Sequence, residues 1–211
     1  MEVRNNSPQR VLWVEGKDDD AVVQSLCERH RVPQVFRIEN KRGVENIREG
    51  LAVEVRSRAL ECFGVVVDAN GDVAGRWSSI RDALLSVGYR DVPNHPASEG
   101  VVLHPPPARP RFGAWVMPHN TTPGMLEDFA AALVPPGDFL WAYAGEVIDK
   151  LPKEHRRFSA AELPKARMHT WLAWQEGPGS PMGQAITKGD LDAFAPAAQK
   201  FVGWLRRLFV E

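Results

Sequence analysis

The first 90 residues alternate between short apolar runs and amphipathic stripes. The apolar runs cover residues 11–14, 35–38 and 62–67, and each has the length of a buried strand. After each run, apolar residues recur every three or four positions, which is typical of a helix packed by one face. These stripes lie at 19–30, 44–55 and 77–87. Strands that alternate with helices predict a parallel sheet covered by helices on both faces.

The middle of the chain interrupts this alternation. Residues 91–110 hold six prolines around the short apolar segment Val101–Leu103. Proline cannot donate to a sheet, so this segment is predicted to be an edge strand beside a surface loop. A further core strand is predicted at 112–117. A helix should follow from about 125 to 134, with Glu127 and Asp128 in its first turn.

The last third of the chain is predicted to be helical. Helices are expected around 139–148 and 164–175, and a loop of glycine and proline at 177–181 precedes a final helix. That helix carries an apolar seam over 191–208 with spacings of three and four, and Pro196 is expected to bend it. Two arrangements would bury this seam. It packs either on the chain's own core or at an interface with a second copy of the chain or with another partner.

These patterns together predict a three-layer, Rossmann-like α/β fold with a mostly parallel sheet. Residues 1–135 should form the α/β core, and residues 136–211 a helical C-terminal part packed on it. The length of 211 residues and the hydrophobic fraction of 44% suit such a globular protein.

Charge and cysteine usage narrow the class of protein. The formal net charge of −1 argues against a strongly cationic coat for nucleic acid, although a local basic groove remains compatible with it. Cys27 and Cys62 both lie in apolar contexts and are expected to be reduced core thiols of a cytoplasmic protein. No apolar run approaches the length of a membrane span, so no membrane association is expected.

Candidate chemistry appears where two of the predicted strands end. Glu15 follows the strand 11–14, and Gly16 after it is expected to turn the chain with a positive φ. Asp18 or Asp19 is expected to cap the next helix. Asp68 directly follows the strand 62–67. If these strands are parallel neighbours, Glu15 and Asp68 meet at the sheet edge where open α/β sheets bind ligands. Two acids there suggest a site for a divalent metal.

Several segments in order along the chain resemble Toprim-like proteins related to the OLD-family nucleases. The resemblance is carried by Val14–Asp19, Val66–Asn70, Trp115–Asn120, Leu126–Phe129 and His169–Gln175. Toprim domains place a Glu-Gly turn after one strand and an Asp-x-Asp turn after a later one. The resemblance implies that Glu15 and Asp68 bind Mg²⁺, or Mn²⁺ in its place, for phosphodiester chemistry.

The resemblance also implies further metal ligands. Asp19 lies four residues after Glu15, and Glu127 and Asp128 stand where OLD-like proteins carry a downstream acid. Acids in the first turn of a helix are common for structural reasons alone, because they interact well with its dipole. Asn70 replaces the second acid of the Asp-x-Asp turn. Its amide oxygen suits Mg²⁺ as a ligand but brings no negative charge.

Lys165 and His169 are one helical turn apart on a predicted helix and share a face. Beside an acidic cluster they would bind a scissile phosphate or serve as general acid. A solvated lysine and a hydrogen-bonded histidine are the structural alternative. Trp171 and Trp174 on another face are expected in the core. His119 is a further metal-ligand candidate, although a lone loop histidine is more often simply solvated.

The leading functional hypothesis is Mg²⁺-dependent hydrolysis of nucleic acid, with DNA and RNA both open. The resemblance also suggests an ATPase partner of the kind found in bacterial defence, since the chain has no nucleotide-binding Gly-x-x-x-x-Gly-Lys-Ser/Thr loop. The alternative is a catalytically inactive, metal-binding interaction module of an ATPase-containing complex. A phosphatase on a similar sheet is a third class, and Asn70 argues against its haloacid-dehalogenase form, which needs an acid there.

Overall fold

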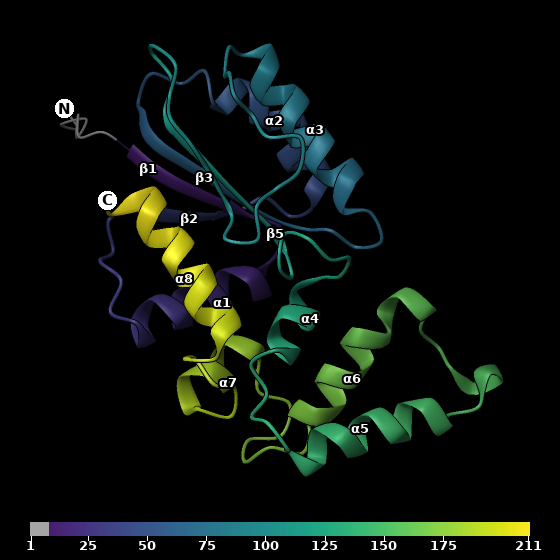
Figure 1. Cartoon of the computed structure of the whole chain (residues 1–211). Coiled ribbons are helices and arrows are strands. Elements are labelled where there is room, and N and C mark those ends of the chain that lie inside the picture. The colour runs from purple at the N-terminus through teal and green to yellow at the C-terminus, as the bar shows by residue number, and fades with distance from the viewer. Residues whose placement is uncertain (1–8) are drawn as a thin grey trace, which may run out of the picture.

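A computed structural model describes residues 9–211, which form three layers around a five-stranded sheet (Figure 1). The strands lie in the order β2-β1-β3-β5-β4, and all pairs are parallel except β4 with β5. Their bounds are β1 (Gln9–Val14), β2 (Arg37–Asn40), β3 (Leu60–Asp68), β4 (Val101–Leu103) and β5 (Arg111–Met117). The predicted α/β class and the predicted edge strand at Val101–Leu103 are both confirmed, and this edge strand is antiparallel to β5.

Eight α-helices follow or flank these strands in the described chain. They are α1 (Lys17–Arg29), α2 (Val44–Glu54), α3 (Val73–Ser86), α4 (Leu126–Ala131), α5 (Phe139–Lys150), α6 (Leu163–Leu172), α7 (Met182–Lys188) and α8 (Pro196–Phe209). Helix α7 was not predicted, because its seven residues are too few to establish a periodic pattern. Strand β2 begins two residues later than the apolar run 35–38 suggests.

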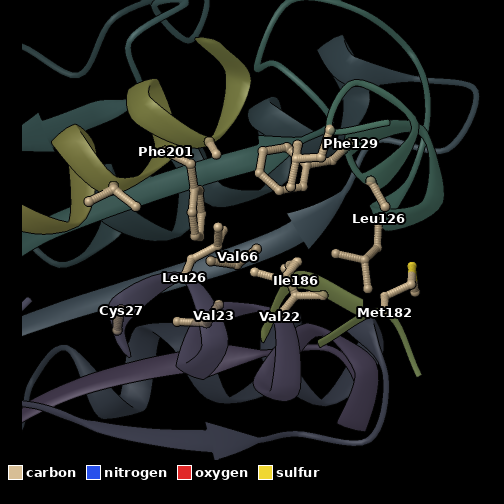
Figure 2. Close-up of a cluster of buried hydrophobic side chains, with 14 of the residues drawn as sticks. Val22, Val23, Leu26, Cys27, Val66, Leu126, Phe129, Met182, Ile186 and Phe201 are labelled. Atoms are coloured by element: carbon tan, nitrogen blue, oxygen red, sulfur yellow. The ribbon is translucent and has the colours of Figure 1, made fainter. Parts of the chain in front are cut away.

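Alternate residues of each central strand enter two separate cores. On one face, β1, β3 and β5 pack against α2 and α3, and Trp13 meets Phe63 edge to face with ring centroids 4.8 Å apart. On the other face, the same strands pack against α1, α4, α7 and α8. Figure 2 shows this second core, where Val66 lies among Leu26 of α1, Ile186 of α7 and Phe201 of α8.

Two glycines let α8 lie close against the sheet. Gly64 of β3 and Gly113 of β5 are paired in register on the face that α8 covers. A Cβ built on Gly64 would lie 2.8 Å from Leu208 Cδ2, and one on Gly113 would lie 2.6 Å from the same atom. Leu208 therefore occupies the space that two side chains would otherwise fill.

The apolar seam of the final helix packs on the chain's own core. Ala198, Phe201, Leu205 and Leu208 are all fully buried there, whereas Phe194 of the same seam is 49% exposed. A homodimer through this part of the chain stays a prediction. The expected bend is wrong. Pro196 is the first residue of α8, and the N–H of a first residue has no acceptor within the helix, so proline interrupts no helical hydrogen bond. Helices α7 and α8 thus complete the helical layer to which α1 belongs. The predicted domain boundary at residue 135 stays a prediction.

Helices α5 and α6 form a hairpin that projects from the rest of the molecule (Figure 1). Phe139 and Tyr143 stack on its outer surface, and Tyr143 also meets Trp174 with ring centroids 5.6 Å apart. Trp171 is buried as expected, but Trp174 is 38% exposed, so its placement in the core is wrong. It follows α6 in a turn, where the helical face no longer determines its direction.

Cys27 and Cys62 are both buried and free, as predicted. Within residues 9–211, no helix combines the length and the apolar character needed to cross a membrane.

Candidate functional site

Glu15 and Asp68 meet at the carboxyl edge of the sheet. Strands β1 and β3 are parallel neighbours, with Val14 opposite Val66, so both acids leave the sheet at the same end. Glu15 Oε1 accepts a hydrogen bond from the backbone N–H of Asp68 at 2.8 Å. Asp68 Oδ1 in turn accepts one from the N–H of Leu126, the first residue of α4, at 3.0 Å. The expected juxtaposition is therefore present, and each carboxylate is oriented through one oxygen.

The turn after Glu15 differs from the expected one. Gly16 has extended backbone, with φ −139°, so a positive φ is not the reason for a glycine here. Helix α1 begins at Lys17, and neither Asp18 nor Asp19 is its N-cap. Asp19 stands in the third helical position, and its Oδ2 accepts a hydrogen bond from Gly16 N–H at 3.0 Å. A Cβ on Gly16 would lie 3.1 Å from that oxygen, so glycine leaves room for the bond.

Five acids line one small hollow at this edge, and four of them have a raised pKa. The hollow measures about 240 Å³ and is bordered by Glu15, Asp18, Asp19, Asp68 and Glu127, and Lys17 and Lys165 also line it. Asp19 and Glu127 are only 6% and 3% exposed. Oδ1 of Asp19 is buried and has no hydrogen-bond partner. The side chains come from α1, β3 and α4 and from the β1–α1 turn, so the fold assembles the hollow from distant parts of the sequence.

Burial raises the pKa of Glu15, Asp19, Asp68 and Glu127, and neighbouring acids add to the rise for the last three. Burial and the neighbouring charges of Asp19, Glu15 and Glu127 raise the pKa of Asp68 to about 8. Burial and the charges of Glu15 and Glu127 raise the pKa of Asp19 to about 7. Burial is also the main cause of the raised pKa of Glu15 and of Glu127. Ionisation of these acids adds negative charge that burial and the neighbouring acids make unfavourable.

Two cations partly offset this charge. Lys165 Nζ lies 3.9 Å from Glu127 Oε1, beyond hydrogen-bond distance, and is half exposed. Arg76 donates from Nε to the backbone oxygen of Asp68 at 2.8 Å, and its charge lowers the pKa of Glu15. Arg76 was not predicted as a site residue. Its place in the first turns of α3, the helix that directly follows β3, could have identified it as a neighbour of Asp68.

Other expected site residues lie elsewhere. Asn70 is exposed, and its side chain lines a separate hollow with Arg48 and Arg76. Its backbone is fixed by a two-bond bridge to Gly124, each N···O distance being 2.7 Å. Asp128 caps its own helix, with Oδ2 accepting from Met125 N–H at 2.9 Å. The structure therefore does not bring either side chain into the acidic hollow.

His169 is exposed on α6, and its charge lowers the pKa of Glu127, so it lies near the hollow without lining it. His119 borders a different hollow, with Trp115 and Lys200. Of the histidines considered from the sequence, neither is therefore placed as a ligand among the acids of the hollow.

The donor chemistry of the hollow fits a hard divalent cation. All five acidic side chains offer carboxylate oxygens, the ligands that Mg²⁺ and Mn²⁺ prefer. One oxygen each of Glu15 and Asp68 is not used in the bonds that orient them, and Asp19 Oδ1 is unpaired. Across residues 9–211, however, no three acid, histidine or cysteine side chains already converge as a metal site. Binding would require these carboxylates to draw together.

The fold and the hollow define an α/β protein with a strongly acidic pocket at the carboxyl edge of a mostly parallel sheet. Comparison with family models matches residues 9–210 to the family described as Protein of unknown function (DUF3226), and the chain belongs to that family. No curated protein and no solved structure matches the chain.

Proposed function

We propose that this protein is a metal-dependent phosphodiesterase that acts on nucleic acid through a Toprim-like site. The observation that carries the proposal is the gathering of Glu15, Asp19, Asp68 and Glu127 around one hollow, each with a raised pKa. Like charges forced together are stabilised by a divalent cation, and the carboxyl edge of a parallel sheet is the usual place for a ligand. The Toprim resemblance of the sequence points to the same chemistry.

In this proposal the oriented acids hold Mg²⁺ or Mn²⁺. Glu15 and Asp68 are the principal ligands because backbone N–H groups fix one oxygen of each and leave the other for the ion. Asp19 and Glu127 add charge from the walls of the hollow. When bound, the ion would activate water and neutralise charge on the phosphate. Asp128 and Asn70 are not in the ligand set. The Asp128 side chain caps α4, and Asn70 lines a separate hollow.

The cations at the rim are assigned to the substrate. Lys165 is half exposed and only loosely paired with Glu127, so its ammonium group is available to a phosphate. His169 is one helical turn further along α6 and is a second candidate for the same task. Arg76 fixes the backbone beside Asp68 through its Nε, and its position at the sheet edge also favours an approaching anion.

Asp68→Asn tests the proposal. Asparagine keeps the size of the side chain and an oxygen that accepts from Leu126 N–H, but it removes the charge. We expect the variant to lose Mn²⁺ binding in calorimetric titration and to lose cutting of labelled DNA or RNA. The matched control is Asp72→Asn, because Asp72 is an exposed N-cap of α3 that asparagine replaces well. Cutting that persists in Asp68→Asn, or an Mn²⁺ affinity equal to that of the control, would contradict the proposal.

The alternative is a metal-binding module that does not catalyse. Asn70 favours it, because this residue stands where the Asp-x-Asp turn has its second acid and its amide brings no charge to an ion. Mn²⁺ binding that depends on Asp68, without cutting of DNA or RNA even when a candidate ATPase partner is added, would identify this module. The ATPase partner and a cytoplasmic location belong to both versions of the proposal.

A further inference from the structure

An exposed stripe of aromatic rings lies on the outer surface of the projecting α5–α6 hairpin (Figure 1). It consists of Phe139 and Tyr143 of α5 and of Trp174, which follows α6. Phe139 is 74% exposed and Tyr143 is 45% exposed. The rings of Phe139 and Tyr143 are nearly parallel, with an interplanar angle of 12°, and the rings of Tyr143 and Trp174 are tilted by 31°. These three side chains, the aromatic stripe, therefore form one continuous surface.

The fold of residues 9–211 uses the other face of α5. Ala144 is fully buried there, and Leu140 and Trp141 pack against the core that α1, α4, α7 and α8 share. Helix α5 is thus apolar on two faces, whereas a surface helix usually has one apolar stripe. Large apolar side chains that are grouped and exposed on a protein surface usually mark a binding site. The aromatic stripe is such a group.

The hairpin is positively charged, unlike the rest of the chain. Residues 139–174 contain six lysines or arginines and four acids, which gives a net charge of +2, so the remaining residues carry −3 of the total of −1. Helix α6 contains Lys165 and Arg167 and no acid. Between the two helices, Lys153 and Arg157 are exposed, and neither forms an ion pair within residues 9–211. The charge of the hairpin is therefore complementary to a polyanion.

Cations lie beside the aromatic stripe and at the acidic hollow. Lys150 comes eleven residues after Phe139, about three helical turns, so the two share a face of α5. Lys150 pairs with Glu146 at 3.1 Å, and both side chains are largely exposed, so this pair is weak. At the start of α6, Lys165 lines the acidic hollow. The hairpin therefore connects the aromatic stripe to the proposed metal site.

We propose that the α5–α6 hairpin binds single-stranded nucleic acid and presents it to the acidic hollow. The bases stack on the aromatic stripe, which accepts any base because every base has a flat π face. The phosphates are attracted by Lys150, Lys153 and Arg157. A duplex keeps its bases stacked on one another and cannot use the rings. The inference rests on the proposed function for the choice of nucleic acid, and it names the form of the substrate and the surface that binds it.

Fluorescence anisotropy with labelled oligonucleotides tests the aromatic stripe. The full chain is titrated into oligothymidylate or oligouridylate of twenty nucleotides, at low salt and with chelator, so that neither metal nor cutting contributes. Phe139→Ala and Tyr143→Ala should each weaken binding by about fivefold or more, the usual effect of removing a stacking ring. Tyr143→Phe keeps the ring and should bind as the wild type does. The matched control is Phe194→Ala, because Phe194 is also half exposed but lies against Arg29 and His30, away from the hairpin.

The salt dependence of the same binding tests the cations. Arg157→Gln should lower the slope of log affinity against log salt by about 0.7, the value for one phosphate contact on a single strand. Arg90→Gln is the control, since Arg90 is an exposed arginine beyond the end of α3 that forms no ion pair within residues 9–211. Its slope should equal that of the wild type.

Four results would overturn the inference. They are the absence of binding to both oligonucleotides at tens of micromolar protein, binding of a duplex as tight as that of the strand, and wild-type affinity in both alanine variants, which would assign the stripe to a protein partner. The fourth is a dimer that Phe139→Ala converts to a monomer, since a second copy would then cover the rings.

Asp68→Asn separates this inference from the proposed function. It should bind the oligonucleotides at least as tightly as the wild type, because it removes a negative charge near the strand, while it loses cutting. Failure of the metal site thus leaves strand binding intact. Wild-type strand binding in the Phe139 and Tyr143 variants, with cutting retained, overturns the role of the aromatic stripe alone.

Discussion

The side chain of Glu15 and the backbone of Asp68 are joined by a hydrogen bond, Oε1 to N, of 2.8 Å. The bond crosses from the end of β1 to the last residue of β3, so it ties two strands together where regular pairing stops. The same carboxylate borders the acidic hollow. Glu15 therefore has a structural role and a proposed ligand role, and substitutions can separate them.

Glu15→Gln should preserve the bond and remove the charge. Glutamine still offers an oxygen to Asp68 N–H, so we expect the metal-free protein to be at least as stable as the wild type, because one of the crowded carboxylates is gone. Mn²⁺ affinity should fall by about tenfold or more, the effect of losing roughly 1.4 kcal/mol or more of binding free energy. Thermal melts with chelator and calorimetric titration measure the two effects.

Glu15→Ala is the companion variant, since it removes both the charge and the acceptor. The unpaired N–H should lower stability by about 1–3 kcal/mol relative to Glu15→Gln. Equal stability of the two variants would show that the bond to Asp68 does not stabilise the fold.

The metal-free protein should lose stability as the pH rises. Asp68 and Asp19 have pKa values of about 8 and about 7 in the folded protein, both raised from 3.8. Their protonated forms are favoured by folding, so the stabilisation is complete below the unfolded pKa and is lost as the pH rises through the folded values. Urea unfolding with chelator should give a free energy lower by a few kcal/mol at about pH 9 than at about pH 5.

Two controls accompany this pH dependence. Asp68→Asn should show a shallower decline, because one titrating group is removed. Saturating Mn²⁺ at the higher pH should restore stability, since it binds the ionised acids of the folded state. A wild-type protein whose stability is flat or rises over this range would contradict the raised pKa values.

Asn70→Asp should leave metal binding nearly unchanged. Asn70 is exposed and lines a hollow other than the acidic one, so a new charge there is screened by solvent. Asn70→Ala should instead destabilise the fold by about 1 kcal/mol, because the residue has φ 51° and alanine tolerates left-handed backbone less well than asparagine. An Mn²⁺ affinity raised tenfold or more in Asn70→Asp, as the Asp-x-Asp resemblance would suggest, would return this residue to the ligand set.

Gly113→Ala should destabilise the packing of α8. The added methyl group would lie 2.6 Å from Leu208 Cδ2, so the helix or the leucine must move. We expect a loss of about 1–3 kcal/mol in urea unfolding, the usual effect of overpacking. The double variant Gly113→Ala with Leu208→Ala tests the cause. It should be less destabilised than the sum of its parts, because the smaller side chain accommodates the methyl group.

Hydrophobic periodicity was sufficient for most of the fold. The runs at 11–14 and 62–67 became parallel neighbours, and that pairing brought Glu15 to Asp68, as their positions at strand ends predicted. The arrangement of α8 could be predicted only as one of two alternatives. Its seam looks the same whether it meets the chain's own sheet or a partner, and the deciding feature is the pair Gly64 and Gly113, which becomes adjacent only after the strands pair.

The candidate site was harder to predict at the level of single side chains. Glu127 and Asp128 are neighbours in sequence, yet Glu127 borders the acidic hollow while Asp128 caps the helix. The sequence pattern cannot separate them, because both occupy the first turn and point in different directions from the same backbone. Arg76 was missed for a related reason: its contact with Asp68 depends on how α3 leaves the sheet, which the local pattern does not specify.

The position of α8 has a consequence for the order in which this protein folds during synthesis. The sheet is complete in sequence at Met117, but the face that carries Gly64, Gly113 and Trp115 is covered by residues 196–209. While the ribosome is still adding the intervening segment, that face has no cover and presents apolar strands to other nascent chains. Contacts across such a separation form late, so a chaperone-binding period should last until α8 emerges. Chains that end before residue 196 and the 211-residue chain free of the ribosome would differ most in protease resistance of β3 and β5.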